Sequence, residues 1–157
     1  MEIAITTLTA DHIPFVHDVF TQNIDILHGG EVISEKDWYD GLLGECADPY
    51  EVNFIILSDR RPAAWLKING LNGDTACISM LVVDRNFQRQ GVGSFAVRYA
   101  EGYARECGKT AVRIQTTRDN TAAANCYLRL GYQIAREMKY AVGDGVLRDG
   151  YEFRKEL

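Results

Sequence analysis

The sequence has no long apolar run and no leader-like start. Its most apolar stretches, such as residues 54–57 and 80–83, are only a few residues long. A membrane-spanning helix needs about 18 apolar residues or more. The first six residues contain Glu2 and alternate between polar and apolar side chains, which is not the pattern of a signal peptide. We therefore expect no contact with a membrane.

Cysteine and histidine are also scarce. The four cysteines, at positions 46, 77, 107 and 126, include no C-x-x-C pair, and the three histidines, at 12, 17 and 28, include no H-x-x-x-H pair. These spacings argue against a metal site. Reduced thiols are the usual state in a chain of this size without a signal peptide. The sequence thus predicts a cytoplasmic protein without metal or disulfide.

The sequence has fewer positively than negatively charged residues, and the two kinds are unevenly distributed along the chain. The net charge is −5, which argues against nucleic-acid binding. Residues 1–83 carry 4 Lys and Arg against 13 Asp and Glu, a balance of −9, whereas residues 84–157 carry 13 against 9, a balance of +4. The second part would suit an anionic ligand and the first a cationic one. A surface whose charge varies without function would give the same pattern.

The order of predicted elements favours a single α+β domain over residues 1–157. At 46% hydrophobic and 25% charged residues, the composition is that of a globular protein. Strands are expected at residues 2–7, 52–58, 63–69, 75–83, 111–116, 132–142 and 150–156, and helices from 9 or 11 to 27 and at 34–45, 92–107 and 121–130. The order is β-α-α-β-β-β-α-β-α-β-β. The helical crossover should make strands 75–83 and 111–116 parallel.

A glycine-containing turn lies between the strand at 75–83 and the helix at 92–107. Gly91 and Gly93 allow a close approach to the backbone, and the first N–H groups of the helix have no partner within it. With Arg85 and Arg89 beside it, this turn is suited to an anion. An ordinary strand-to-helix turn remains an equally good reading. The dinucleotide fingerprint and the Walker A loop do not fit, because Ala96 stands where a third glycine would be and no Gly-Lys-Ser/Thr follows.

A second segment opens the next helix, at Asn120-Thr121-Ala122-Ala123-Ala124. Asn120 is a good N-cap, and the run of alanines would let another group pack closely against the helix. Tyr127 follows near the end of the helix. By itself, a tyrosine in this place is more often part of the core than a catalytic group.

Together, the two segments resemble the GNAT superfamily of acetyl-CoA-dependent N-acetyltransferases. Gln88-x-x-Gly91-x-Gly93 is similar to the family's Arg/Gln-x-x-Gly-x-Gly/Ala loop, and Leu81-x-Val83 to the strand end before it. Asn120-x-x-Ala123-x-x-x-Tyr127-x-x-x-Gly131-Tyr132 is similar to the later helix motif. The motif matches cover about residues 75–132. The resemblance implies a mixed, mostly antiparallel central sheet with helices on both faces.

The resemblance also implies a reaction and its residues. An acetyl group would pass from acetyl-CoA directly to a primary amine, leaving coenzyme A. Tyr127, at the family's tyrosine position, would be the acid for the leaving sulfur. The acetyl-CoA-binding residues would be Leu81, Val83, Gln88, Arg89, Gln90, Gly91, Val92, Gly93, Ser94 and Asn120. The acidic residue that some members use as a base has no obvious counterpart, because Cys77 and Ser79 stand in that region.

The amine acceptor is expected near the turn at Gly29-Gly30. Asp25, His28 and Glu31 would attract an ammonium group, and Trp38 would offer it an aromatic face. Ordinary surface charge and a core tryptophan are the simpler readings of these residues. We expect a small-molecule amine as the partner. A protein or peptide amine and a non-catalytic acetyl-CoA-binding module are alternatives, and a homodimer is left open by the sequence.

Overall fold

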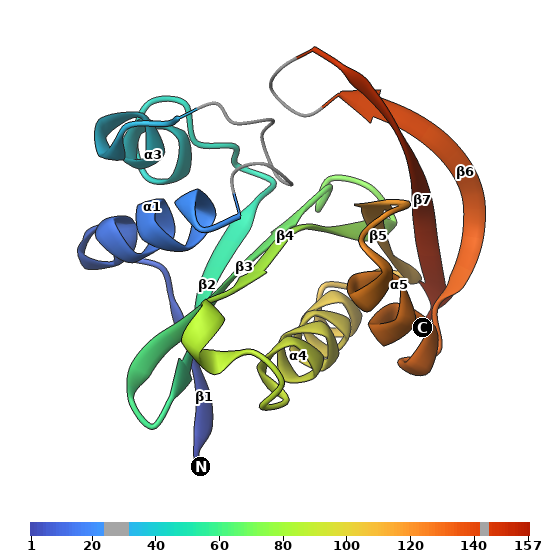
Figure 1. The fold of residues 1–157 in the computed structure, drawn as a ribbon, viewed down its shortest axis with the longest axis horizontal. Helices are drawn as coiled ribbons and strands as arrows, with labels where there is room; N and C mark the ends of the chain where they lie inside the picture. Colours follow the sequence, from blue (N-terminus) through green and yellow to red (C-terminus); the bar gives the residue numbers. More distant parts are fainter. Residues whose placement is uncertain (24–31, 142–144) are drawn as a thin grey trace.

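One seven-stranded sheet organises the chain (Figure 1). The computed structural model describes residues 1–23, 32–141 and 145–157; Asp25, His28 and Glu31, which we expected near the acceptor, lie outside them. The strands are β1 (Ile3–Thr7), β2 (Val52–Ser58), β3 (Arg61–Asn69), β4 (Thr75–Val83), β5 (Ala111–Thr117), β6 (Gln133–Ala141) and β7 (Leu147–Glu156). Their order across the sheet is β1-β2-β3-β4-β5-β7-β6.

The strand directions follow the predicted topology. Among the strands in the described part of the chain, β4 and β5 run parallel, and every other neighbouring pair is antiparallel. Helix α4 (Val92–Glu106) makes the crossover between these two parallel strands. The α+β class and the parallel pairing predicted from the sequence are therefore confirmed.

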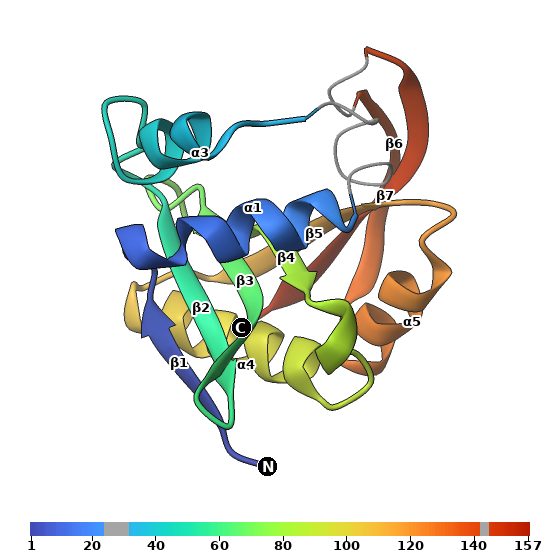
Figure 2. The same ribbon diagram turned by 60° about the vertical axis from the view of Figure 1, so that its left-hand side comes forward.

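Helices cover the sheet on both faces (Figures 1 and 2). On one face, α1 (Ile13–Thr21) and α3 (Glu35–Leu42) pack on Ile55, Trp65 and Val82. On the other, α4 and α5 (Thr121–Arg129) share a larger apolar core with β2–β5 and β7. Strands β2, β3 and β4 are covered on both faces, and their sequences are therefore nearly continuously apolar instead of alternating.

Two strands begin two or more residues earlier than the sequence predicts. Strand β3 begins at Arg61, because Asp59 (φ 48°) and Arg60 (φ 69°) form a two-residue turn that pairs Ser58 with Arg61. Strand β7 begins at Leu147, three residues before the predicted start, because it pairs with the far end of β6 at Ala141. Both corrections come from hairpin pairing, which a single strand's periodicity does not reveal.

Two further observations bear on cellular context. No helix in the described ranges is long and apolar enough to cross a membrane. All four cysteines are free thiols, and Cys77 is the buried one.

A buried ionic network ties α4 to the end of α5 and to β7. Glu101 on α4 is 5% exposed, and its carboxylate accepts from the Lys155 ammonium at 2.9 Å and from the Tyr132 hydroxyl at 3.2 Å. The Lys155 ammonium also donates to the Leu130 carbonyl at 2.9 Å, just beyond α5. Burial, helped by Glu101, raises the pKa of Tyr132 far above its ordinary value, so this tyrosine stays neutral. The network fixes the carboxyl end of α5.

Replacing Glu101 with glutamine should destabilise the fold by about 2–3 kcal/mol, because Lys155 would keep a partly buried charge without its counter-ion. Urea denaturation would measure the change. Glu106→Gln is the matched control, since Glu106 lies on the same helix but is exposed. Equal midpoints for the two variants would contradict a stabilising role for the network.

Candidate active site

Strands β4 and β5 part half-way along their length. They pair from Thr75 opposite Ala111 only as far as Ile78 opposite Ile114, although β4 continues to Val83 and β5 to Thr117. Beyond Ile78, the edge of β4 that faces β5 has no ladder partner among the described residues. Peptide-like amide groups can pair with such an edge as an added strand would. Leu81 and Val83, which the family resemblance gave as acetyl-CoA-binding residues, lie in this segment.

A β-bulge marks the point of divergence. Lys67 of β3 lies opposite Met80 and Ile68 lies opposite Ile78, so Ser79 has no direct partner in β3. Bulges bend a strand and redirect its side chains, and they are frequent beside active sites. The Ser79 hydroxyl is buried and has no hydrogen-bond partner within the described part of the chain. Sequence reasoning noted Ser79 but missed the bulge, because registers of neighbouring strands are needed to see it.

Removing this hydroxyl should not harm the fold. An unpaired buried hydroxyl is unfavourable, so Ser79→Ala should raise the melting temperature without ligand by up to about 4 °C for a change of about 1 kcal/mol. If a ligand group pairs with the hydroxyl, the further rise caused by acetyl-CoA should be smaller in the variant. Thermal denaturation with and without acetyl-CoA checks both. A less stable free variant would show that Ser79 has a structural partner.

The glycine turn leads from β4 to an open helix end. Asp84 caps a short 3-10 turn by accepting from the Asn86 N–H at 2.8 Å. Arg89 (φ 62°) and Gly91 (φ 82°) then reverse the chain into α4. No side chain caps α4, and its first turn contains no acidic residue. The N–H groups of Val92, Gly93 and Ser94 therefore begin the helix as candidate donors to an anion.

The two glutamines of the turn bind the backbone of the same segment. The Gln88 side chain donates to the Val83 carbonyl at 3.4 Å, and the Gln90 side chain donates to the Asn86 carbonyl at 3.3 Å. The Gln88 bond holds the turn against the end of β4, and the Gln90 bond lies within the turn itself. Gln88 and Gln90 are thus placed to shape the loop, and direct contact between their side chains and acetyl-CoA stays a prediction.

Helix α5 starts from the end of β5, so α4 and α5 both begin where the two strands diverge (Figure 2). Asn120 caps α5 by accepting from the Ala123 N–H at 3.4 Å, as its sequence position predicts. Tyr127 is 8% exposed, and its ring packs against Phe153 at 5.5 Å between centroids and against Tyr132 at 6.4 Å. The ring is therefore held in place by the core of the α4–α5 face.

Of the four predicted acceptor residues, only Trp38 can be located. Its ring is 8% exposed and makes edge contacts with Phe20 at 4.8 Å and Trp65 at 5.3 Å. It thus belongs to the core beneath α1 and α3. A contact between this ring and an ammonium group has no support in this placement and stays a prediction.

A polar cluster that sequence reasoning missed lies beside the divergence. Glu152 of β7 accepts from Arg113 at 3.1 Å, from Gln115 at 3.2 Å and from Arg136 at 3.5 Å. Partial burial works to raise the pKa of Glu152, but the hydrogen bonds from Gln115, Arg136 and Arg113 together hold it below its usual value. The cluster depends on β7 inserting between β5 and β6, which chain order alone does not predict.

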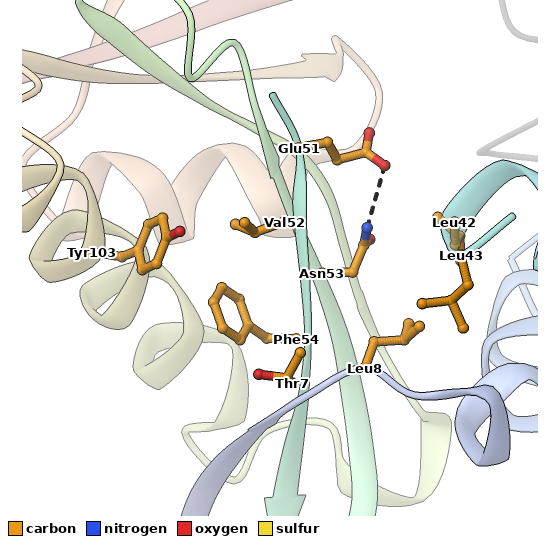
Figure 3. A pocket seen from close by; sticks show the side chains of 9 residues that line it. All are labelled: Thr7, Leu8, Leu42, Leu43, Glu51, Val52, Asn53, Phe54 and Tyr103. Carbon is orange, nitrogen blue, oxygen red and sulfur yellow. Dashed lines mark hydrogen bonds between the residues drawn. The ribbon is translucent and has the colours of Figure 1, made fainter. Parts of the chain in front are cut away.

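Two open cavities do not coincide with the divergence of β4 and β5. One, of about 380 Å³, lies around the start of β2, with Tyr103 on one side of that strand and Leu42 and Leu43 on the other (Figure 3). The second, of about 420 Å³, lies between β1 and α4 and includes Gly91 and Arg98. The first shares no residue with the glycine turn or with α5. Backbone geometry, not cavity size, therefore identifies the candidate site.

Of the residues that the structure describes, no group has the arrangement of a metal site.

Comparison with known proteins identifies the family to which this chain belongs. Residues 18–132 match the sequence model of the Acetyltransferase (GNAT) family. The chain belongs to this family. Its members use acetyl-CoA, so the chain is an acetyl-CoA-dependent acyltransferase, and the family resemblance and cofactor predicted from the sequence are confirmed. A search of the curated proteins found no match.

Solved structures of the same fold include proteins with different acceptors. The ribosomal-protein-S18-alanine N-acetyltransferase of Escherichia coli is 20% identical, with a TM-score of 0.76 over 99% of this chain and 94% of that one. The spermidine/spermine N-acetyltransferase of Vibrio cholerae is 12% identical, with a TM-score of 0.81 over 98% and 93%. The yncA protein of Salmonella typhimurium, solved with its cofactor acetyl-CoA, is 15% identical, with a TM-score of 0.76 over 100% and 95%. At these identities the likeness shows the GNAT fold, which confirms the predicted architecture, but not the acceptor.

Proposed function

We propose that this chain transfers the acetyl group of acetyl-CoA directly to the primary amine of a small molecule. The observation that supports this proposal most directly is the divergence of β4 from β5. The uncapped start of α4 lies at the end where these two strands separate. A free strand edge and a free helix end are the two backbone features that an extended amide chain and a diphosphate require.

The residues present fit acetyl-CoA. When bound, this cofactor supplies the acetyl group as an activated thioester. The N–H groups of Val92, Gly93 and Ser94 would hold its diphosphate, and the positive charges of Arg85 and Arg89 would add to the attraction. The backbone of Leu81 and Val83 would pair with the amides of the pantetheine arm. An N–H of the same stretch would stabilise the oxygen that gains negative charge during transfer.

Tyr127 is proposed as the acid that protonates the leaving sulfur. It lies on α5, at whose start the two strands diverge, and its ring is fixed against Phe153. A positioned phenol near the thiolate lowers the barrier by general acid catalysis. Glu152 is not proposed as the base, because its bonds to Arg113, Gln115 and Arg136 favour the ionised form and lower its pKa.

A small acceptor is preferred on charge. Residues 1–83, with a balance of −9, include the segment where the acceptor is expected, and this charge would attract an ammonium group. The protein or peptide amine is the second candidate, and related folds include an enzyme named for a ribosomal protein.

Free thiols at all four cysteines support a reducing compartment such as the cytosol.

The test is amine-dependent release of coenzyme A. Purified protein would be mixed with acetyl-CoA and a panel of amino acids, polyamines, aminoglycosides and short peptides, with thiol release followed over time. We expect release with at least one small amine and none without an amine. Turnover with peptides alone would favour the second candidate. Acetyl-CoA binding without turnover on any amine would contradict an active enzyme and favour a binding module.

A further inference from the structure

The sheet face opposite α4 and α5 carries a line of polar side chains beside the divergence. In β5, Val112 and Ile114 are buried on the α4 side, so Arg113 and Gln115 project to the opposite face. Cys77 lies opposite Arg113, Glu152 lies opposite Gln115, and Arg136 follows opposite Glu152. These side chains therefore occupy one continuous stretch of the sheet, across β4, β5, β7 and β6.

This stretch is accessible from outside. The apolar residues of α1 and α3 pack on β2, β3 and β4 through Ile55, Trp65 and Val82. Figure 1 shows these helices at one end of the sheet and the β6–β7 hairpin at the other. The side chains of Arg113 and Arg136 are 37% and 58% exposed, whereas that of Glu152 is 14% exposed. A molecule approaching the divergence from this face would meet the guanidinium groups first.

The cluster has one more positive charge than it can neutralise. Arg113 and Arg136 share the single carboxylate of Glu152. Four other cations of the sheet and its hairpins have a carboxylate each: Lys67 with Glu51, Arg118 with Glu137, Lys139 with Asp149, and Arg154 with Glu156. The shared carboxylate thus distinguishes this site from the paired surface charges around it.

The free donors belong to Arg113. Arg136 directs both Nε and Nη2 toward Glu152, at 3.3 Å and 3.5 Å. Arg113 uses Nη1 alone, at 3.1 Å, and within residues 1–23, 32–141 and 145–157 its Nε and Nη2 make no hydrogen bond. One side of a planar guanidinium is therefore fixed and the other is open. An open guanidinium edge is matched by a carboxylate, which can accept two parallel hydrogen bonds.

The open edge lies within reach of the acetyl-transfer site. Arg113 pairs with Cys77, one step before the last β4–β5 pair, and Ser79 follows two residues beyond Cys77. Two residues along a strand span about 7 Å. An amine next to the free edge of β4 and a carboxylate at Arg113 would thus belong to one small molecule. The buried Ser79 hydroxyl, which has no hydrogen-bond partner among the described residues, is a second polar atom on this stretch of β4 that a bound molecule would satisfy.

We propose that the acceptor is an amino acid or a similar small amine that carries a carboxylate, and that Arg113, positioned by Glu152, binds this carboxylate. The inference rests on the proposed function and narrows its substrate class. It also reconciles the two charge balances. The ammonium group would be attracted by the acidic first part of the chain, and the carboxylate by the surplus guanidinium.

The test compares each of the common amino acids with its carboxamide, which keeps the amine and side chain but removes the negative charge. We expect kcat/KM to be about 10- to 100-fold higher for the best free acid than for its amide, the range of a charge-assisted hydrogen bond. In Arg113→Gln this preference should vanish, mainly through a higher KM for the acid. Arg118→Gln, which removes a paired charge from the end of β5, should keep it.

Equal use of acid and amide by the wild type would overturn the proposal, as would an Arg113→Gln variant that retains the preference. A binding measurement separates this failure from failure of the proposed function. In the presence of coenzyme A, the acid should raise the melting temperature of the wild type but not of Arg113→Gln, whether or not turnover occurs. No difference between acid and amide in this assay would contradict the carboxylate site even if thiol release is observed.

Discussion

Phenylalanine at position 127 should lower kcat by about 100-fold or more, while KM for acetyl-CoA stays within about twofold. General acid catalysis contributes about 10²- to 10⁴-fold in rate, and Tyr127→Phe removes only the proton donor. The ring contacts with Phe153 and Tyr132 involve carbon atoms that phenylalanine keeps. Steady-state thiol release with the best amine, measured against both substrates, would give the two constants.

Tyr132→Phe is the matched control. Tyr132 is 2% exposed, belongs to the same aromatic cluster and directs its hydroxyl to Glu101, within the buried ionic network. Losing that hydrogen bond should reduce the free energy of unfolding by about 1 kcal/mol, without a comparable loss in kcat. If both variants lost activity equally, the effect would be one of packing. If Tyr127→Phe kept full activity, the proposed acid would be wrong.

The elements that the sequence predicted best are those defined by local pattern. The strands 52–58 and 75–83 have the bounds that the sequence predicted, and α4 ends one residue early, at Glu106. The Ser34 hydroxyl accepts from the Asp37 N–H at 3.1 Å and so caps α3 at the predicted start of the 34–45 helix. Caps, glycine turns and apolar periodicity are properties of neighbouring residues, so one chain segment contains all the information that they need.

The features that the sequence did not predict depend on strand pairing. The bulge at Ser79 requires the register between β3 and β4, and the Glu152 cluster requires β7 to lie between β5 and β6. The place of Trp38 could not be predicted from the sequence either, because it depends on contacts between distant residues. A tryptophan near a glycine turn suits a ligand or a core, and only its contacts with Phe20 and Trp65 favour the core.

Valine at position 91 should weaken acetyl-CoA binding by about 10- to 100-fold. Gly91 has φ 82°, a conformation that a β-branched residue rarely adopts, and it immediately precedes the open N–H groups of α4. A side chain here would distort the turn that presents those groups and would occupy the approach to them. Isothermal titration with acetyl-CoA, at a temperature where both the wild type and the variant are fully folded, would measure the change in Kd.

Gly108→Val separates this effect from backbone strain. Gly108 follows the other end of the same helix, has φ 76° and, like Gly91, has no atom within 4 Å of an added Cβ. Both variants should therefore lose a similar free energy of unfolding, about 1–3 kcal/mol for a strained backbone. Only Gly91→Val should lose affinity for acetyl-CoA. Equal Kd values in the two variants would show that the turn does not hold the diphosphate, and would leave the free edge of β4 as the part of the site that carries the binding.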